Sequence, residues 1–145
     1  MKKKKMKKII LLLSFILTLA SCSPRLTESV QTSYPNGQPE LVLMFNKSGE
    51  CVRSVEYYDS GSVKMEGEMK NGQRDGEWTA YFPDGRVQSH GYFKNGERTG
   101  DSKVYWSNGN LRYVGHYKNG THCGKWTWYD EQGNFLREEN YGDCD

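Results

Sequence analysis

Gly67 to Gly85 reads GEMKNGQRDGEWTAYFPDG, and the same pattern returns from Gly91 (GYFKNGERTGDSKVYWSNG) and from Gly115 (GHYKNGTHCGKWTWYDEQG). Turn glycines extend the period of 24 residues beyond these copies, at Gly37, Gly61, Gly85, Gly109 and Gly133. A period in the twenties is typical of stacked repeats, in which one unit cannot bury its apolar face alone. The sequence therefore predicts about five units, three well formed and two worn, near residues 34–57, 58–81, 82–105, 106–129 and 130–145.

Each unit has the pattern of a β-hairpin. Residues 63–70 alternate apolar and polar side chains, which is typical of a strand with one buried face. Asn71-Gly72 and its two later equivalents favour tight turns, because glycine takes positive φ easily and asparagine tolerates it. Residues 76–82 return as a second strand, and Pro83-Asp84-Gly85 turns into the next unit. Because no segment after the leader shows a capped helical period, the expected class is all-β.

Hairpins joined by short turns at both ends place each new strand beside the last one. We therefore expect an elongated, curved, single-layer antiparallel meander that grows by two strands per repeat. Glycine inside a strand often marks the close approach of another group. We expect an aromatic ring from an adjacent strand to cover the bare backbone of Gly67, Gly91 and Gly115.

Residues 1–21 have the composition of an export signal. Six lysines precede an apolar run of about 12 residues, whereas a spanning helix needs roughly 20. Leu19-Ala20-Ser21-Cys22 resembles a lipobox, the signature of bacterial lipoproteins. The resemblance implies cleavage before Cys22, diacylglycerol on its sulfur and acylation of the new amino terminus with chains such as palmitate, which anchor a protein firmly to a membrane. An ordinary signal peptide with an incidental cysteine is the alternative.

The residues after Cys22 bear on location. Lipoprotein sorting rules, as the resemblance implies them, make Ser23 favour the outer membrane, with the leaflet undecided. Residues 22–33 are polar and lack hydrophobic periodicity, so we expect a lipidated flexible tether followed by a repeat domain over residues 34–145.

The formal charge of +2 is misleading, because six of the 20 basic residues belong to the leader. The remaining 14 basic and 18 acidic residues give the mature chain a charge of −4. Nucleic-acid binding requires a concentrated basic surface, so we expect no nucleic-acid partner. The 16 glycines and ten tyrosines of the full chain suit a sheet with many turns.

The repeat itself resembles the membrane occupation and recognition nexus (MORN) repeat, in the variant found in bacterial proteins such as the YwqK-type antitoxins. The resemblance covers about Tyr34 to Asp143, and it departs from the pattern at Ser102, where neighbouring copies have Trp78 and Trp126. It implies a curved sheet that serves as a scaffold or a dimerisation surface, and in some eukaryotic proteins as a lipid-binding module. A protein partner is therefore expected, as an unidentified envelope protein, a toxin or a second copy of the chain.

Repeated aromatic residues form the candidate binding surface: Trp78, Tyr81, Tyr105, Trp106, Trp126, Trp128 and Tyr129. One interpretation makes them the core of a sheet that coils enough to cover itself. A second interpretation leaves an apolar face uncovered, and such a face marks an interaction site. A third places the tyrosines in an exposed row that stacks on cell-wall glycan.

The remaining cysteines bear on stability. Export permits disulfides, and a last hairpin closed near Gly133 would place Cys123 opposite Cys144, while Cys51 has no evident mate. We expect no metal site, because no Cys-x-x-Cys pair occurs. Neither a nucleophile elbow nor a phosphate-binding loop is present, so we expect no catalytic residues, no cofactor and no enzymatic activity.

Overall fold

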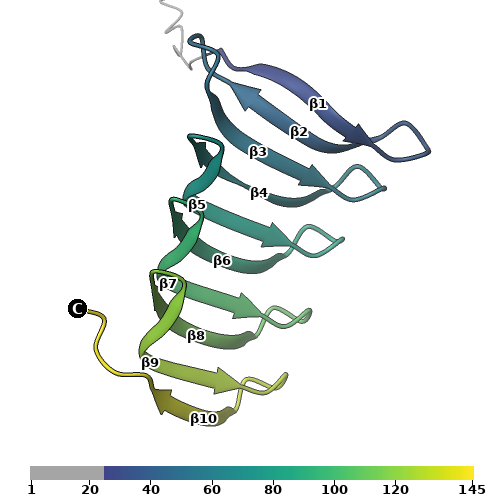
Figure 1. Ribbon diagram of the computed structural model, residues 1–145. Coiled ribbons are helices and arrows are strands. Elements are labelled where there is room, and N and C mark those ends of the chain that lie inside the picture. The colour runs from purple at the N-terminus through teal and green to yellow at the C-terminus, as the bar shows by residue number, and fades with distance from the viewer. Residues whose placement is uncertain (1–24) are drawn as a thin grey trace, which may run out of the picture.

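The computed structural model describes residues 25–145 as one open antiparallel sheet (Figure 1). Each strand pairs with the next, so the order in space is the order in sequence. The strands are β1 (Thr27–Ser33), β2 (Pro39–Phe45), β3 (Cys51–Tyr57), β4 (Val63–Lys70), β5 (Gln73–Tyr81), β6 (Val87–Lys94), β7 (Glu97–Tyr105), β8 (Leu111–Lys118), β9 (Thr121–Tyr129) and β10 (Phe135–Asn140). The predicted all-β meander is confirmed, and within residues 25–145 no helix is long and apolar enough to cross a membrane.

β1 corrects the expected tether. The segment from Thr27 to Ser33 pairs with β2 along its length, so the prediction of a flexible tether is wrong for these residues. Polar strands are difficult to recognise from a pattern, because backbone hydrogen bonds to a neighbour can hold an edge strand that buries little. Val30 of β1 is 53% exposed. The export signal and Cys22 lie outside the described residues.

Two kinds of turn lie at opposite ends of the strands (Figure 1). At one end, Asn71, Asn95 and Asn119 have φ of 51°, 49° and 47°, and the glycine after each also has positive φ. Two successive positive φ angles define the tight turn whose twist matches that of the flanking strands. The predicted Asn-Gly hairpins are therefore confirmed.

At the other end of the strands, side-chain hydrogen bonds connect the turn region of one repeat to that of the next. The Tyr34 hydroxyl donates to the Tyr57 carbonyl at 2.9 Å, and the Tyr58 hydroxyl donates to the Tyr81 carbonyl at 2.9 Å. Trp106, two periods after Tyr58, uses its Nε1 to donate to the carbonyl of Tyr129 at 3.1 Å. These bonds span 23 residues each and fix one repeat against its neighbour.

Tryptophan rings on bare glycine backbone form the main core. A Cβ on Gly67 would lie 2.2 Å from the Trp78 ring, and one on Gly115 would lie 2.1 Å from the Trp126 ring. Trp78 is 5% exposed and Trp126 is 1% exposed. The expected close approach is confirmed at these two glycines but not at Gly91, whose nearest side-chain neighbour is the Ser102 hydroxyl at 3.7 Å.

A smaller core lies on the other face near the amino-terminal end. Val42 pairs with Val55, and Val55 pairs with Glu66, so these residues share the face opposite the tryptophans. Both valines are at most 4% exposed. The buried side of the sheet therefore changes along its length, which alternation within a single strand could not predict.

Candidate functional site

Arginine side chains lie over aromatic rings on the face that carries the tryptophans. The Arg74 guanidinium lies 4.2 Å from the centre of the Trp78 ring, and the Arg98 guanidinium lies 5.2 Å from Phe93 and 5.4 Å from Tyr117. Cation–π contacts of this kind contribute about 0.5–1 kcal/mol each at exposed sites. We call this surface the cation–aromatic face and define it by Arg74, Trp78, Phe93, Arg98, Trp106, Arg112, Tyr117, Trp128 and Arg137.

The middle repeat breaks a stacking rule that its neighbours keep. Arg74 stacks on Trp78, and His122 stacks on Trp126 with ring centres 3.9 Å apart. Arg98 occupies the equivalent position one period away, but the residue four places after it is Ser102. Since Arg98 has no tryptophan beneath it, its guanidinium lies between the Phe93 ring of its own repeat and the Tyr117 ring of the next.

A hollow of about 350 Å³ lies beside Arg98, and we call it the middle hollow. Its lining has aromatic walls, two guanidinium groups and small polar groups but no carboxylate: Phe82, Gln88, Ser89, Arg98, Val104, Tyr105, Trp106, Ser107, Arg112 and Tyr113. The Arg112 guanidinium lies 4.5 Å from the centre of the Trp106 ring. This arrangement suits a ligand that carries both negative charge and apolar surface.

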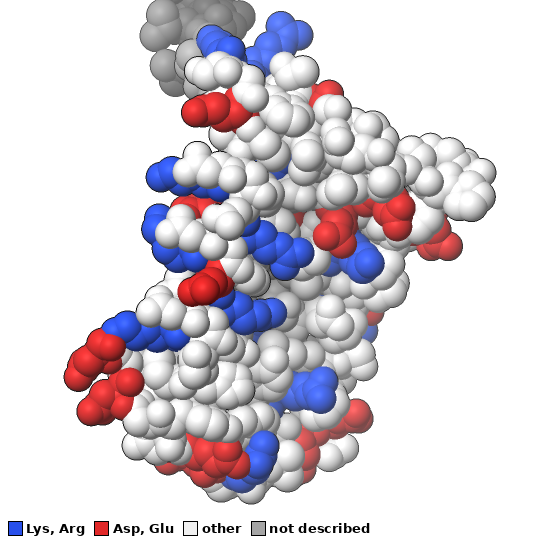
Figure 2. Space-filling model, in the orientation of Figure 1, with Lys and Arg blue, Asp and Glu red and all other residues white. Residues whose placement is uncertain are grey.

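Arg98 and Arg112 also differ from the other arginines in their charge partners. Carboxylates pair with the remaining arginines between residues 53 and 137, namely Arg53, Arg74, Arg86 and Arg137. Within residues 25–145, neither Arg98 nor Arg112 forms an ion pair. Figure 2 shows basic and acidic side chains interspersed with uncharged surface along the visible side of the sheet.

The opposite face has charges that already pair with one another. Glu66 accepts hydrogen bonds from Arg53 at 2.7 Å and from the Tyr81 hydroxyl at 3.0 Å. Burial acts to raise the pKa of Glu66, but the bonds from Arg53 and Tyr81 outweigh it and hold that pKa below its ordinary value. Burial, together with the bond to Glu66, raises the pKa of Tyr81. The hollow at this site, of about 220 Å³, therefore offers no unpaired arginine.

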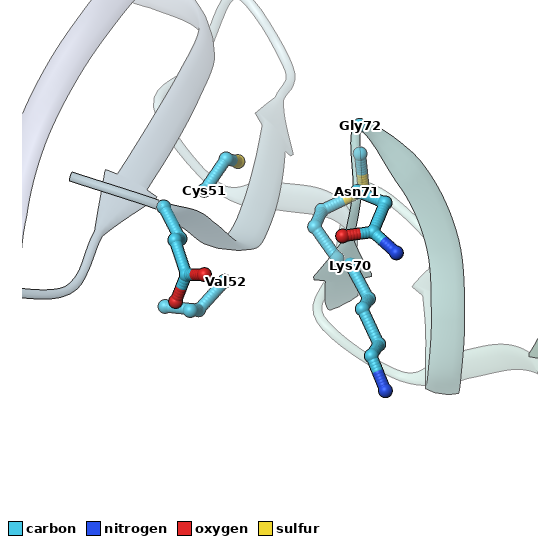
Figure 3. Close-up of a pocket in the computed structure, with 7 residues that line it drawn as sticks. Cys51, Val52, Lys70, Asn71 and Gly72 are labelled. Carbon is cyan, nitrogen blue, oxygen red and sulfur yellow. The ribbon is translucent and has the colours of Figure 1, made fainter. Parts of the chain in front are cut away.

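A third hollow, of about 320 Å³, lies between the start of β3 and the turn at Asn71-Gly72 (Figure 3). Its lining includes Glu50, Lys70 and the free thiol of Cys51. Cys51 and Lys70 lie on opposite sides of the hollow, and the Lys70 side chain points away from the thiol (Figure 3). No set of groups converges there on one reacting atom.

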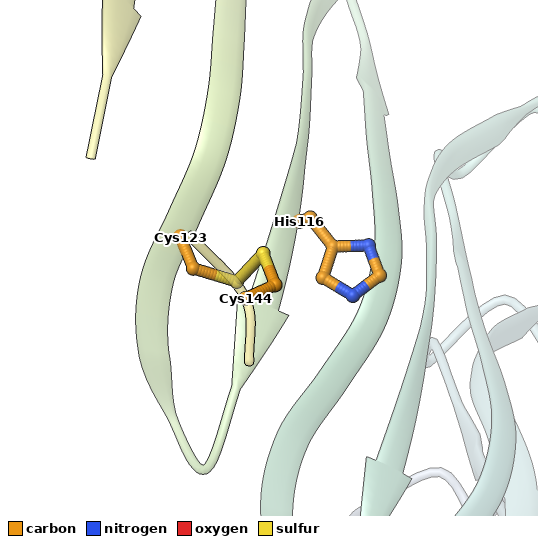
Figure 4. A group of neighbouring side chains, drawn as sticks. All are labelled: His116, Cys123 and Cys144. Carbon is orange, nitrogen blue, oxygen red and sulfur yellow. A yellow bond between two sulfur atoms is a disulfide. The ribbon is translucent and has the colours of Figure 1, made fainter. Parts of the chain in front are cut away.

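Cys123 and Cys144 form a disulfide, with Cα atoms 5.2 Å apart, which is the pairing expected from the sequence. His116 lies beside it (Figure 4), and the imidazole and both sulfurs fall within 4.8 Å of one another. A disulfide sulfur is not the thiolate that zinc takes as a ligand. His116 also shares a hydrogen bond of 2.9 Å with Asp101 through Nδ1. We therefore interpret this cluster as a disulfide that stabilises the carboxyl-terminal segment and not as a metal site.

The predicted aromatic surface is corrected in two positions. Trp78 and Trp126 are core residues, because their rings lie flat on glycine backbone and are almost fully buried. The other five candidates are half-buried: Tyr81, Tyr105, Trp106, Trp128 and Tyr129. Tyr105 and Trp106 line the middle hollow, whereas the Tyr81 hydroxyl is bonded on the opposite face.

Sequence reasoning missed the arginines. Arg98 repeats Arg74 at the period of 24 residues, and Ser102 lies one period after Trp78 and one period before Trp126. Both signals were visible in the sequence. Their meaning depends on the contact between Arg74 and Trp78, which the sequence does not show. Only that contact explains why a serine instead of a tryptophan at position 102 changes the surroundings of Arg98.

The fold and its surface define a non-globular β-repeat protein with one open, cation-rich aromatic face. Comparison with known families places the chain more closely. The MORN repeat variant matches residues 52–71, 74–95, 98–119 and 123–143, and the chain belongs to this family. The first hairpin lies outside the matched segments.

A second match is to the prokaryotic membrane lipoprotein lipid attachment site, over residues 6–23. It identifies a lipid-anchored lipoprotein of the bacterial envelope. No curated protein matches the chain. Among solved structures, the chain is similar to one described as "Crystal structure of GtfA/B complex bound to UDP and GlcNAc", with a TM-score of 0.43 and 18% identity over 88% of this chain and 29% of that one. At that score, the likeness transfers no property.

Proposed function

We propose that this lipoprotein is a non-enzymatic scaffold that holds a protein partner against its cation–aromatic face. The middle hollow is the observation that carries the proposal, because it combines aromatic walls with two arginines that have no ion-pair partner in residues 25–145. Aromatic and arginine side chains contribute most of the energy at many protein interfaces. A single-layer sheet also leaves this face without a second layer to cover it.

The arrangement of ionisable groups supports binding rather than catalysis. The middle hollow has no carboxylate or histidine to act as a general acid or base. On the opposite face, His90 contacts Glu77 at 2.9 Å and Glu66 is held by Arg53, so these groups are engaged as pairs. We therefore assign the protein no reaction.

The lipid anchor determines where in the envelope the protein would bind its partner. A lipid on Cys22 would hold the sheet at a membrane surface, and Ser23 favours the outer membrane by the sorting rules that lipoproteins resemble. The described sheet begins only a few residues after the anchor, at Thr27. We propose that the sheet binds its partner close to the membrane and not at the end of a long tether.

The resemblance to YwqK-type antitoxins favours a toxin as the partner, so we include an immunity role within this proposal. Glycan binding by a tyrosine row has less support. Tyr81 and Tyr105 are half-buried, and the Tyr81 hydroxyl is already bonded to Glu66. Stacking on sugars requires free ring faces, and these two positions offer little ring surface.

A crosslinking pull-down of the acylated full-length protein from its own envelope tests the scaffold function. We compare the unmodified protein with Arg112→Glu on the cation–aromatic face and with Lys103→Glu, which makes the same charge change on an exposed residue of the opposite face. The proposal expects one stoichiometric protein partner that Arg112→Glu loses and Lys103→Glu keeps. Equal recovery by both variants, or recovery of wall fragments alone, would contradict it.

A further inference from the structure

We propose that the middle hollow is a carboxylate-binding site that receives an acidic side chain from the surface of the partner protein. This inference rests on the proposed scaffold function and names the chemistry by which the partner is recognised. It follows from the exchange of one residue in one repeat.

The first step is the release of Arg98. In the flanking repeats a tryptophan holds the equivalent side chain, Arg74 on Trp78 and His122 on Trp126. Ser102 offers no ring, so Arg98 keeps only the more distant rings of Phe93 and Tyr117, at 5.2 and 5.4 Å. The Arg98 guanidinium therefore lies farther from the nearest ring centre than that of Arg74 does, and it lines the hollow.

The second step concerns the charge of the two arginines that line the hollow. Arg98 and Arg112 line one hollow that contains no acidic side chain, and in the described part of the chain they are not ion-paired. The guanidinium group presents its donors in a planar fork that matches the two oxygens of a carboxylate. Two such groups around one hollow leave a local positive charge that an incoming carboxylate would neutralise.

A third observation concerns Ser102, which lies close to Arg98 but outside the lining of the middle hollow. The Ser102 side chain is 2% exposed, and its Oγ has no hydrogen-bond partner within residues 25–145. From the point where a Cβ on Gly91 would lie, Ser102 Oγ is 3.7 Å away and Arg98 Nη1 is 3.9 Å away, so both groups lie over the same bare backbone. A buried hydroxyl without a partner is unfavourable. Because this hydroxyl is enclosed and does not line the hollow, the carboxylate site rests on the two arginines and not on Ser102.

The fourth step concerns the walls. Phe82, Trp106 and Tyr113 line the hollow beside the two arginines and give it apolar surface. A hydrogen bond or ion pair is stronger where water is excluded. The walls also have room for apolar side chains next to the acid, so the favoured partner segment carries a glutamate or an aspartate flanked by apolar residues.

The test uses a defined probe. A fluorescently labelled, blocked peptide of sequence Gly-Phe-Glu-Leu-Glu-Phe-Gly is titrated with the acylated full-length protein in detergent and followed by anisotropy. The same peptide with glutamine in place of glutamate is the control ligand. We expect the acidic peptide to bind, the neutral one to bind about tenfold more weakly, and the difference to shrink at about 0.5 M salt.

Matched variants locate the site. Arg98→Gln and Arg112→Gln should each weaken binding of the acidic peptide about tenfold, while Lys103→Gln, which removes an exposed positive charge from the opposite face, should not. Equal binding of the two peptides would overturn the inference, as would an effect of Lys103→Gln that matches that of Arg98→Gln. So would binding of phosphatidylglycerol vesicles or inorganic phosphate by a protein that ignores the acidic peptide.

The pull-down separates this inference from the scaffold function. If a partner is recovered equally by the unmodified protein, Arg98→Gln and Arg112→Gln but is lost by Arg112→Glu, then the scaffold stands and the carboxylate site is wrong. If no partner is recovered but the acidic peptide binds as described, the site stands and the scaffold function fails.

Discussion

Glycine and tryptophan act as one unit in two of the repeats. The rings of Trp78 and Trp126 occupy the space that a side chain would need at Gly67 and Gly115. Gly91 lies at the same repeat position but has Ser102 instead of a ring beside it. The three glycines look equivalent in the sequence, and the structure gives them different roles.

Replacing these glycines by alanine should therefore have unequal effects. Gly67→Ala would push the methyl group into the Trp78 ring and should lower the free energy of unfolding by about 1–3 kcal/mol. Gly91→Ala meets no atom closer than 3.7 Å and should change stability by no more than about 0.5 kcal/mol. Urea denaturation of both variants measures the difference. Equal losses would contradict the packing described here.

The Glu66 carboxylate gives the fold a dependence on pH. Its folded pKa lies below the ordinary value of 4.5, so its bonds to Arg53 and Tyr81 stabilise the protein fully above that pH. The contribution is lost as the pH falls through the lowered folded pKa. Because the pair is partly exposed, we expect about 0.5–1 kcal/mol.

Glu66→Gln should therefore reduce the urea midpoint at neutral pH and flatten its decline between about pH 5 and pH 3. The exposed Glu97→Gln removes one negative charge without removing an ion pair seen in the structure. That control should follow the unmodified curve. If both variants have the same acid limb, the Glu66 bonds do not contribute as stated.

Tight turns were the most predictable elements, because Asn-Gly fixes its backbone locally. β1 was the least predictable, since its polar residues are held by the ladder to β2 and not by an apolar pattern. The last strand, β10, is followed by a disulfide that joins Cys144 to Cys123 of β9. Residues after β10 continue the pairing with β9 through the amide of Tyr141, which donates to the Gly124 carbonyl at 2.9 Å.

The disulfide should hold this end of the sheet in place. Cys144→Ser opens a loop with a sequence separation of 21 residues and should cost about 3 kcal/mol. Hydrogen exchange should speed up first in β10 and in the residues after it. Cys51→Ser, which removes a free thiol, should leave exchange in β10 unchanged. Unchanged exchange after Cys144→Ser would show that the strand holds without the bond.

At the scale of the whole molecule, the repeat period and the turn chemistry were enough to predict the meander. The binding surface was harder to predict, because alternation placed the tryptophans on one face without saying which of them lie flat on glycine. Arg98 and Arg112 were overlooked for a related reason. These two arginines stand out because no carboxylate lines the hollow beside them. Which side chains lie near an arginine depends on the pairing register of several strands, and the sequence alone does not give that register.

One substitution reverses the feature on which the binding site depends. Ser102→Trp restores the residue found at the equivalent positions of the flanking repeats, and the bare backbone of Gly91 has room to receive the ring. We expect Arg98 to stack on the new ring as Arg74 does on Trp78. The variant should fold at least as stably as the unmodified protein, since it gains an aromatic contact over glycine.

The most direct measurement is the amount of partner retained by Ser102→Trp in the envelope pull-down, with urea denaturation of the same preparation as the check on folding. We expect a stable variant that loses the partner, because Arg98 is withdrawn from the middle hollow. A stable Ser102→Trp protein that retains the partner in full would contradict the claim that this hollow is where the partner binds.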